Sequence, residues 1–241
     1  MKRRHLLLSL GLIQAALAAG ITWGLHAADR AFPPPLEMAA ERSREVLDAD
    51  GRLLRAFTTK DGKWRLSTRA GDVDPQYVKM LVAYEDQRFY RHGGIDAFAI
   101  GRAAFQLATH GRIVSGASTL SMQVARLIEP RTDRSISAKL LQMARAVQIE
   151  RRLSKAEILD LYLNLAPYGG NLEGVRSASL AYFGKEPKRL AVGEAALLVA
   201  LPQLPEKRRP DRYHQNAEAA RKRVLDRLAV SAVIGEGEAE R

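Results

Sequence analysis

Two adjacent acids, Glu85 and Asp86, open the stretch 85–96, in which an aromatic residue, His92 and a Gly-Gly pair follow closely. The segment before Glu85 carries apolar residues at helical spacing, so we expect a buried helix to run into it. If that helix continues, Glu85, Phe89 and His92 share one face until the glycines end it. A carboxylate at the end of a buried helix can act as a general base in a cleft. The alternative is a solvated acidic helix end without a chemical role.

A second group of polar residues lies between positions 115 and 126. Ser118 or Thr119 is expected to cap a following helix by accepting hydrogen bonds from its free N–H groups. A helix amino end with adjacent hydroxyls can bind an anion, and Gln123 and Arg126 follow on the same helix. The alternative is a capped helix with a structural role only.

Basic and amide side chains continue on the next two predicted helices. The first spans 135–152 and carries Lys139 and Gln142. Its apolar face is expected to consist of Ile136, Leu140, Met143 and Val147. A capping box, Ser154 with Glu157, opens the second helix, and Arg151 and Lys155 beside it can present charge to a cleft.

Most of the remaining chain has helical patterning, with Glu194 expected near a helix start and a last amphipathic helix over 217–230. Residues 45–57 alternate around an Asp-Gly turn and predict a β-hairpin, which we expect to be the only sheet of consequence. The glycine-rich segment 166–175 lacks the Lys-Ser/Thr pair of a P-loop and follows a helix, so it is not interpreted as one. The predicted fold class is mainly α with a small hairpin.

Composition supports a folded domain with an anionic partner. The chain has 241 residues, 46% of them hydrophobic, which is enough for a core. Its net charge of +11 suits nucleic acid, an anionic membrane face or a diphosphate-bearing substrate. There is no cysteine, so disulfides and thiolate metal sites are excluded.

The amino-terminal segment predicts a membrane anchor. Basic residues precede Leu6 to Leu25, which contains no charge and is long enough to cross a bilayer. A cleaved signal peptide is the alternative, and both place the rest of the chain outside the cytoplasm. The expected parts are 1–27 as cytoplasmic tip and anchor, 28–44 as a linker, 45–230 as the globular domain and 231–241 as a frayed tail.

The motifs together resemble the peptidoglycan glycosyltransferase family (glycosyltransferase family 51, the amino-terminal module of class A penicillin-binding proteins). Glu85-Asp86 with Phe89, His92, Gly94 and Asp96 is similar to its first signature, and four further blocks match in the same order. The resemblance runs from about Glu45 to about Leu228. The Ala-Pro-Tyr-Gly-Gly and Arg-Pro-Asp-Arg segments look most like the penicillin-binding protein 1C subgroup. The resemblance implies a lysozyme-like, mainly helical domain.

It also implies a reaction, the polymerisation of lipid II into β-1,4-linked glycan strands. The donor is α-linked to undecaprenyl diphosphate, so a β product requires inversion. The resemblance makes Glu85 the general base that takes the proton of the acceptor hydroxyl, while cations stabilise the departing diphosphate. The substrate contacts it implies are Asp86, His92, Ser118, Thr119, Gln123, Arg126, Lys139, Gln142, Arg151 and Lys155.

Two positions depart from the family pattern. Arg126 stands where the family often has Lys, and Gln142 replaces a second glutamate. A neutral amide keeps the hydrogen bonds of that acid but not its charge. We therefore expect weak metal dependence: a divalent cation (Mg or Mn) is a conceivable cofactor that the sequence does not require, and no metal ligands are assigned.

The expected location is the outer face of a bacterial cytoplasmic membrane, with lipid II, the growing glycan and other cell-wall synthesis proteins such as a transpeptidase as partners. No Ser-x-x-Lys or Lys-Thr-Gly occurs, so no transpeptidase chemistry is expected in these residues; a monofunctional protein and the front part of a longer one both stay open. The alternative function is a tethered lipid II-binding or scaffold protein with little turnover. Nucleic acid is not expected as a partner.

Overall fold

The structure, a computed structural model, describes residues 14, 16–17, 19–20, 23–24, 26–27, 29–110, 118–130, 133 and 135–239. The chain divides into two compact units, residues 1–35 and 36–241. In the first unit the described residues up to Ala31 are helical. No helix among the described residues is both long and apolar enough to cross a membrane. Much of the predicted anchor, Leu6 to Leu25, lies outside those residues.

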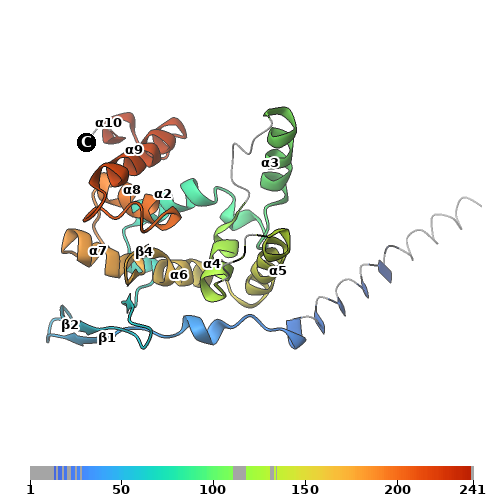
Figure 1. Ribbon diagram of the computed structural model, residues 1–241, viewed down its shortest axis with the longest axis horizontal. Helices are drawn as coiled ribbons and strands as arrows, with labels where there is room; N and C mark the ends of the chain where they lie inside the picture. The colour runs from blue at the N-terminus through green and yellow to red at the C-terminus, as the bar shows by residue number, and fades with distance from the viewer. Residues whose placement is uncertain are drawn as a thin grey trace, which may run out of the picture. The chain divides into compact units, whose positions relative to one another are not determined.

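The second unit is mainly helical, so the predicted fold class is confirmed in its coarse form (Figure 1). Its helices are α2 (Pro75–Glu85), α3 (Ala97–His110), α4 (Leu120–Ile128), α5 (Ile136–Arg152), α6 (Lys155–Leu165), α7 (Val175–Phe183), α8 (Val192–Ala200), α9 (His214–Val230) and α10 (Glu236–Ala239). Short 3-10 helices are η1 (Leu36–Ala39), η2 (Ala70–Asp72), η3 (Phe89–Arg91) and η4 (Leu201–Gln203). The strands are β1 (Arg44–Leu47), β2 (Leu53–Phe57), β3 (Trp64–Arg65), β4 (Pro167–Gly169) and β5 (Leu172–Glu173).

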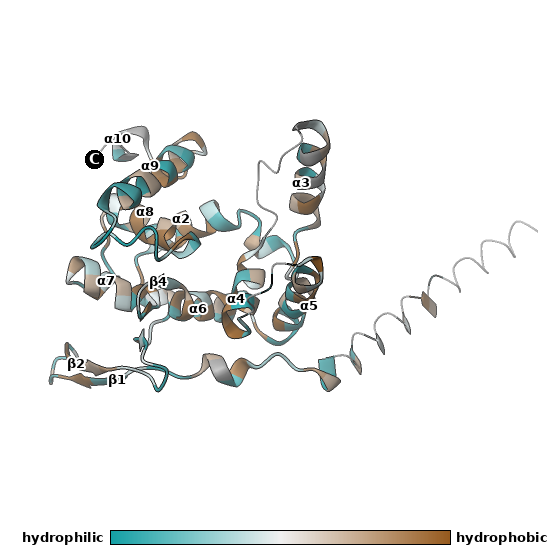
Figure 2. Ribbon diagram, in the orientation of Figure 1, coloured by the Kyte–Doolittle hydropathy of each residue, from teal (hydrophilic) through white to brown (hydrophobic). Residues whose placement is uncertain are grey.

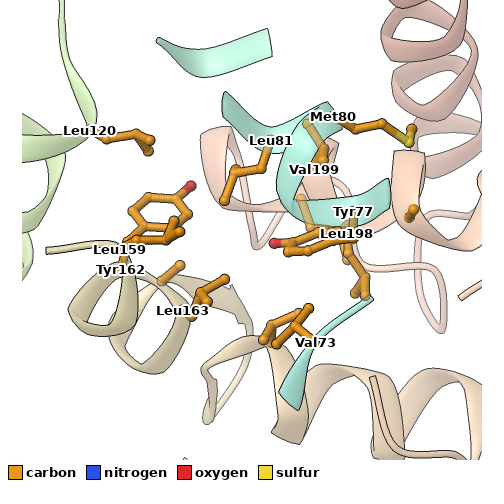
Figure 3. Packing of buried hydrophobic residues seen from close by; sticks show 14 of the residues in the cluster. Val73, Tyr77, Met80, Leu81, Leu120, Leu159, Tyr162, Leu163, Leu198 and Val199 are labelled. Atoms are coloured by element: carbon orange, nitrogen blue, oxygen red, sulfur yellow. The ribbon is translucent and has the colours of Figure 1, made fainter. Parts of the chain in front are cut away.

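The core forms around α2, which packs against α8 and α9, while α4 packs against α5 and α6. Figure 3 shows Tyr77 and Leu81 of α2 between side chains of α6 and of α8. Small apolar residues make α8 suitable for this central place, because five of its nine positions are buried. The last turn of α2, which ends in Glu85, is thereby attached to a rigid core.

The sheet prediction was half right. The expected hairpin is present, with β1 antiparallel to β2. A second sheet, however, has the order β3-β5-β4, with β3 parallel and β4 antiparallel to β5. Its strands are two or three residues long, too short to give an alternating sequence pattern. The glycine-rich segment 166–175 thus forms β4 and β5 instead of a plain turn.

The predicted apolar face of α5 was wrong in its first half. Ile136 is 82% exposed and Leu140 is 59% exposed, whereas the buried side chains of α5 are Ala146 and Ile149. Hydrophobic colour therefore appears on the outside of this region as well as in the core (Figure 2). Periodicity alone identified the helix, but it could not tell which stripe faces the protein.

The predicted helix caps are confirmed. Thr119, rather than Ser118, caps α4 by accepting from the amide of Met122. Ser154 and Glu157 form the expected capping box at the start of α6. Glu194 accepts a hydrogen bond from the amide of Ala191 and so lies at the start of α8.

The helix that carries Glu85 does not continue to His92, so Glu85, Phe89 and His92 do not share one helical face. It ends at Glu85, and a short turn leads to η3. Gly94 then adopts a φ of +96°, and a Cβ there would lie 2.7–2.8 Å from backbone atoms of Ala146 and Val147 in α5. A glycine is required because the turn lies directly against the backbone of another helix.

Replacing Gly94 with Ala is expected to lower the free energy of unfolding by about 2–5 kcal/mol, because the left-handed φ and the backbone clash act together. Gly93→Ala is the matched control: its Cβ meets nothing within 4 Å and its φ is not positive. Chemical denaturation of both variants measures the difference. Equal stability of the two would contradict this account of the turn.

Candidate active site

Glu85, the last residue of α2, is held by two neutral amides. Its Oε2 accepts a hydrogen bond from Nε2 of Gln123 in α4 at 2.8 Å. Its Oε1 accepts one from Nε2 of Gln203 in η4, also at 2.8 Å. No ion pair engages Glu85 within the described part of the chain. Amides only donate here, so the carboxylate keeps lone pairs with which to accept a proton.

Asp86 connects the end of α2 to the start of α4. Both of its oxygens lie 3.0 Å from Nε2 of His92, and Oδ2 also accepts from the amide of Leu120 at 2.9 Å. The amide of Gly94 donates to Nδ1 of His92, which assigns the imidazole proton to Nε2. Asp86 and the His92 ring are buried. The two predicted substrate contacts therefore bond to each other and to the backbone.

The amino end of α4, predicted as an anion site, is occupied by the protein's own groups. The Asp86 carboxylate accepts a hydrogen bond from the amide of Leu120, and the Thr119 hydroxyl oxygen accepts one from the amide of Met122. Thr119 is buried and donates to the carbonyl of Gly94 at 2.7 Å. Glu85, Ser118 and Thr119 still line one small cavity of about 60 Å³, together with Tyr84, Asp86, Gln87, Arg88, Asp96, Ala99, Arg102 and Arg227.

A larger, basic cavity of about 550 Å³ lies between α4 and α5. Arg126, Lys139, Gln142 and Arg145 line it, as do the acids Glu129 and Asp133. Within the described residues no hydrogen bond or ion pair engages the guanidinium of Arg126. Three of the predicted substrate contacts, Arg126, Lys139 and Gln142, thus line this basic cavity. A fourth, Gln123, is hydrogen-bonded to Glu85.

Lys139 connects Gln142, which lines this cavity, to Ser118, which lines the cavity at Glu85. Its ammonium donates to the Ser118 hydroxyl at 2.6 Å and to Oε1 of Gln142 at 3.1 Å, and Nε2 of Gln142 donates to the Met122 carbonyl at 2.6 Å. Burial, and then the charge of Arg126, lower the pKa of Lys139. Two cations thus face one space, which favours an anion between them.

The pKa of Tyr162 in α6 is affected both by Glu85 and by Arg126 of the basic cavity. Burial, and then the charge of Glu85, raise its pKa, whereas Arg126 lowers it. Its hydroxyl is buried and has no hydrogen-bond partner within the described residues. Figure 3 shows this hydroxyl pointing toward the space between Leu81 and Leu120. Glu85 and Arg126 therefore lie within electrostatic reach of one group.

Two predicted contacts lie elsewhere. Lys155 donates to Oε1 of Glu150 at 2.6 Å, and its ammonium lies 4.5 Å from the centre of the Phe89 ring. Arg151 is exposed in the last turn of α5. Neither residue lines the cavity at Glu85 or the basic cavity. Sequence spacing placed them near the motifs, but it could not give the direction of their side chains.

The sequence reasoning missed Gln203 and two arginines. Arg208 donates to Oε1 of Gln203 at 3.1 Å. Arg227 of α9 lines the cavity at Glu85 and lies 4.7 Å from the centre of the Tyr84 ring. A glutamine between two prolines, Leu-Pro-Gln-Leu-Pro, was the available signal, because such a rigid loop can present a polar side chain.

The Gln142 side chain does not fit as a ligand of a divalent metal ion. Within the described residues no three His, Asp or Glu side chains form a group that could bind one. The Gln142 oxygen already accepts from an ammonium group, and its nitrogen faces a carbonyl. Mg²⁺ and Mn²⁺ prefer carboxylate oxygens, and this position offers none.

Comparison with known proteins shows the family of the chain. The family model described as Transglycosylase matches residues 50–229. The chain is 48% identical over 211 residues to penicillin-binding protein 1C of Escherichia coli, covering 88% of this chain and 27% of that protein. This chain belongs to the transglycosylase family. The resemblance predicted from the motifs is confirmed, and it extends to penicillin-binding protein 1A of Vibrio cholerae, 36% identical over 80% of this chain and 23% of that protein.

This transglycosylase chain spans about a quarter of the length of these relatives. A crystal structure of penicillin-binding protein 1A from Haemophilus influenzae overlaps it with a TM-score of 0.45 and 20% identity, over 83% of this chain and 20% of that one.

Replacing Asp86 with Ala should destabilise the transglycosylase domain by about 2–4 kcal/mol, because a buried carboxylate with three hydrogen-bond contacts is lost. Asp50→Ala is the control: Asp50 pairs with Arg52 on the surface, where both side chains are 75% exposed. That change should cost about 0.5 kcal/mol or less. Denaturant titration of the two variants tests the difference, and similar losses would contradict the role given to Asp86.

Proposed function

We propose that the chain is a peptidoglycan glycosyltransferase domain that polymerises lipid II into β-1,4 glycan strands with inversion at the donor carbon. Membership of the transglycosylase family supports this proposal. The observation that carries it is the environment of Glu85: this carboxylate lines a cavity, and among the described residues its hydrogen bonds come from two neutral amides. Such a group can accept a proton, whereas a carboxylate paired with a cation is a poorer base.

The reaction forms one bond and breaks one. The acceptor's sugar hydroxyl attacks the anomeric carbon of the donor while Glu85 takes the hydroxyl proton. The bond from that carbon to the diphosphate oxygen breaks on the opposite face, and undecaprenyl diphosphate leaves with the electron pair. A direct displacement of this kind inverts the configuration and needs no covalent enzyme intermediate.

Arg126 and Lys139 are the groups proposed to bind the diphosphate. They line one cavity, and the charge of Arg126 lowers the pKa of Lys139. An anion bound between them relieves that repulsion, and it gains charge-assisted hydrogen bonds from a planar guanidinium and a flexible ammonium. Stabilising charge that develops on a leaving group is a large part of catalysis in such sites.

We propose that the domain binds its substrate at the membrane surface. α3 exposes Phe98 and Phe105, and the first half of α5 exposes Ile136 and Leu140. Exposed large apolar side chains on amphipathic helices are typical of contact with a bilayer interface. We place the domain on the outer face of a bacterial cytoplasmic membrane, attached by one amino-terminal helix, with other cell-wall synthesis proteins as partners.

Glu85→Gln should reduce polymerisation of labelled lipid II by about 10²–10⁴-fold, the range for loss of a general base, because an amide cannot accept the proton. Lipid II binding, measured separately, should change little. Glu218→Gln, an exposed change on α9, is the control and should keep the parental rate. A fully active Glu85→Gln enzyme would end this assignment. A parent that binds lipid II without turnover would favour the tethered scaffold instead.

Chelation of divalent ions should leave the parental rate within about twofold, because Gln142 itself offers no carboxylate and no three His, Asp or Glu side chains form a metal-binding group within the described residues. Gln142→Glu restores the acid beside Lys139, and this variant should gain a measurable response to Mg²⁺ or Mn²⁺. The assay compares both proteins with and without the ion. If the rate of the variant does not respond to the ion, or if the parent requires the ion for activity, the role assigned to Gln142 is wrong.

A further inference from the structure

Gln203 connects Glu85 to a guanidinium on the opposite side of the amide. Its Nε2 donates to Oε1 of Glu85 at 2.8 Å, and its Oε1 accepts from Nη1 of Arg208 at 3.1 Å. Arg208 also donates to the carbonyl of Ala200, the last residue of α8, at 2.6 Å. These contacts form a continuous chain from the end of α8 to the carboxylate at the end of α2.

The donors and acceptors in this series of hydrogen bonds can be arranged in only one way. A guanidinium has donors and no acceptor, so the oxygen of the Gln203 amide must face Arg208. The NH₂ group must then face Glu85, where it can only donate. Glu85 therefore accepts one N–H hydrogen bond on each of its two oxygens. Neither amide has a lone pair on nitrogen with which to take the proton away.

The backbone that presents Gln203 is fixed. Leu201 and Pro202 are buried, and the amide of Leu204 donates to the carbonyl of Leu201 at 3.2 Å. Proline at 202 restricts the backbone further. Burial, and then the charge of Arg223, lower the pKa of Arg208, while the charge of Glu85 acts in the opposite direction. Arg208 is thus within electrostatic reach of Glu85 without touching it.

We propose that Gln203, oriented by Arg208, is a positioning residue that sets the direction of the Glu85 carboxylate toward the incoming hydroxyl. This inference rests on the proposed function of Glu85. A glutamate side chain has several rotamers in water, and a hydrogen bond from each side restricts it to one. Gln123 fixes one oxygen from α4, and Gln203 fixes the other from η4. The carboxylate is then already oriented before the substrate binds, so binding energy is not needed to orient it.

Two changes at one position separate positioning from structural support. Gln203→Met removes both hydrogen bonds at nearly constant volume. Gln203→Glu keeps an acceptor for Arg208 but replaces the NH₂ donor with a second carboxyl group beside Glu85, and this pair either repels or shares one proton. A purely structural role predicts an active Gln203→Glu enzyme, since the contact with Arg208 remains. Gln215→Met, an exposed glutamine on α9, is the matched control.

In steady-state polymerisation of lipid II, both Gln203 variants should lose at least about tenfold in kcat with KM within about threefold, since orientation of the base acts on the chemical step. Melting temperatures should stay within about 4 °C of the parent, which corresponds to no more than about 1–2 kcal/mol. A Gln203→Met/Arg208→Met double variant should be no slower than Gln203→Met alone. The two residues belong to one series of hydrogen bonds, so the effects of their substitution on kcat should not be additive.

Glu85→Gln run alongside distinguishes the two levels of the argument. If Glu85→Gln keeps the parental rate, the proposed function fails. If Glu85→Gln is inactive but Gln203→Glu keeps the parental kcat, or if only KM changes, the positioning role of Gln203 is overturned and the function stands. If Gln203→Met does not fold, Gln203→Glu decides alone, because it retains the contact with Arg208.

Discussion

The buried carboxylate of Asp86 is the interaction on which the site depends. It receives the imidazole of His92 and the first amide of α4, and therefore joins the end of α2, the turn after it and the start of α4. A carboxylate at a helix amino end is favoured by the unpaired N–H groups and by the helix dipole. Since Glu85 is its direct neighbour in sequence, locking Asp86 also fixes the backbone of Glu85.

The placement of α4 follows from this lock, and α4 carries residues of both halves of the site. Gln123 faces Glu85, and three residues later Arg126 lines the basic cavity. Residues three apart lie on neighbouring parts of a helix surface, so one rigid helix sets the separation between the base and the cations.

The sequence was informative where the chemistry depends on local order. Glu85 at a helix end, the cap at Thr119 and the capping box at Ser154 were all predicted, because capping depends on residues within one turn. The exposed half of α5 was not, since a 3.6-residue period shows that a stripe exists and not which neighbour covers it. Gln203 could not be assigned to Glu85 because 118 residues separate them, and only the packing of α8 against α2 brings them together.

The site has neutral amides beside its charged groups. Glu85 is bounded by Gln123 and Gln203, and Lys139 contacts Gln142 rather than a carboxylate. An acid at either glutamine beside Glu85 would place two like charges together, and one of them would take up a proton. An acid at 142 would neutralise the ammonium that faces the basic cavity. Amides supply the same hydrogen-bond geometry without adding a charge. In the proposed reaction a proton moves toward Glu85 and negative charge develops toward Arg126 and Lys139, and neutral side chains beside these groups keep the two opposite charges apart.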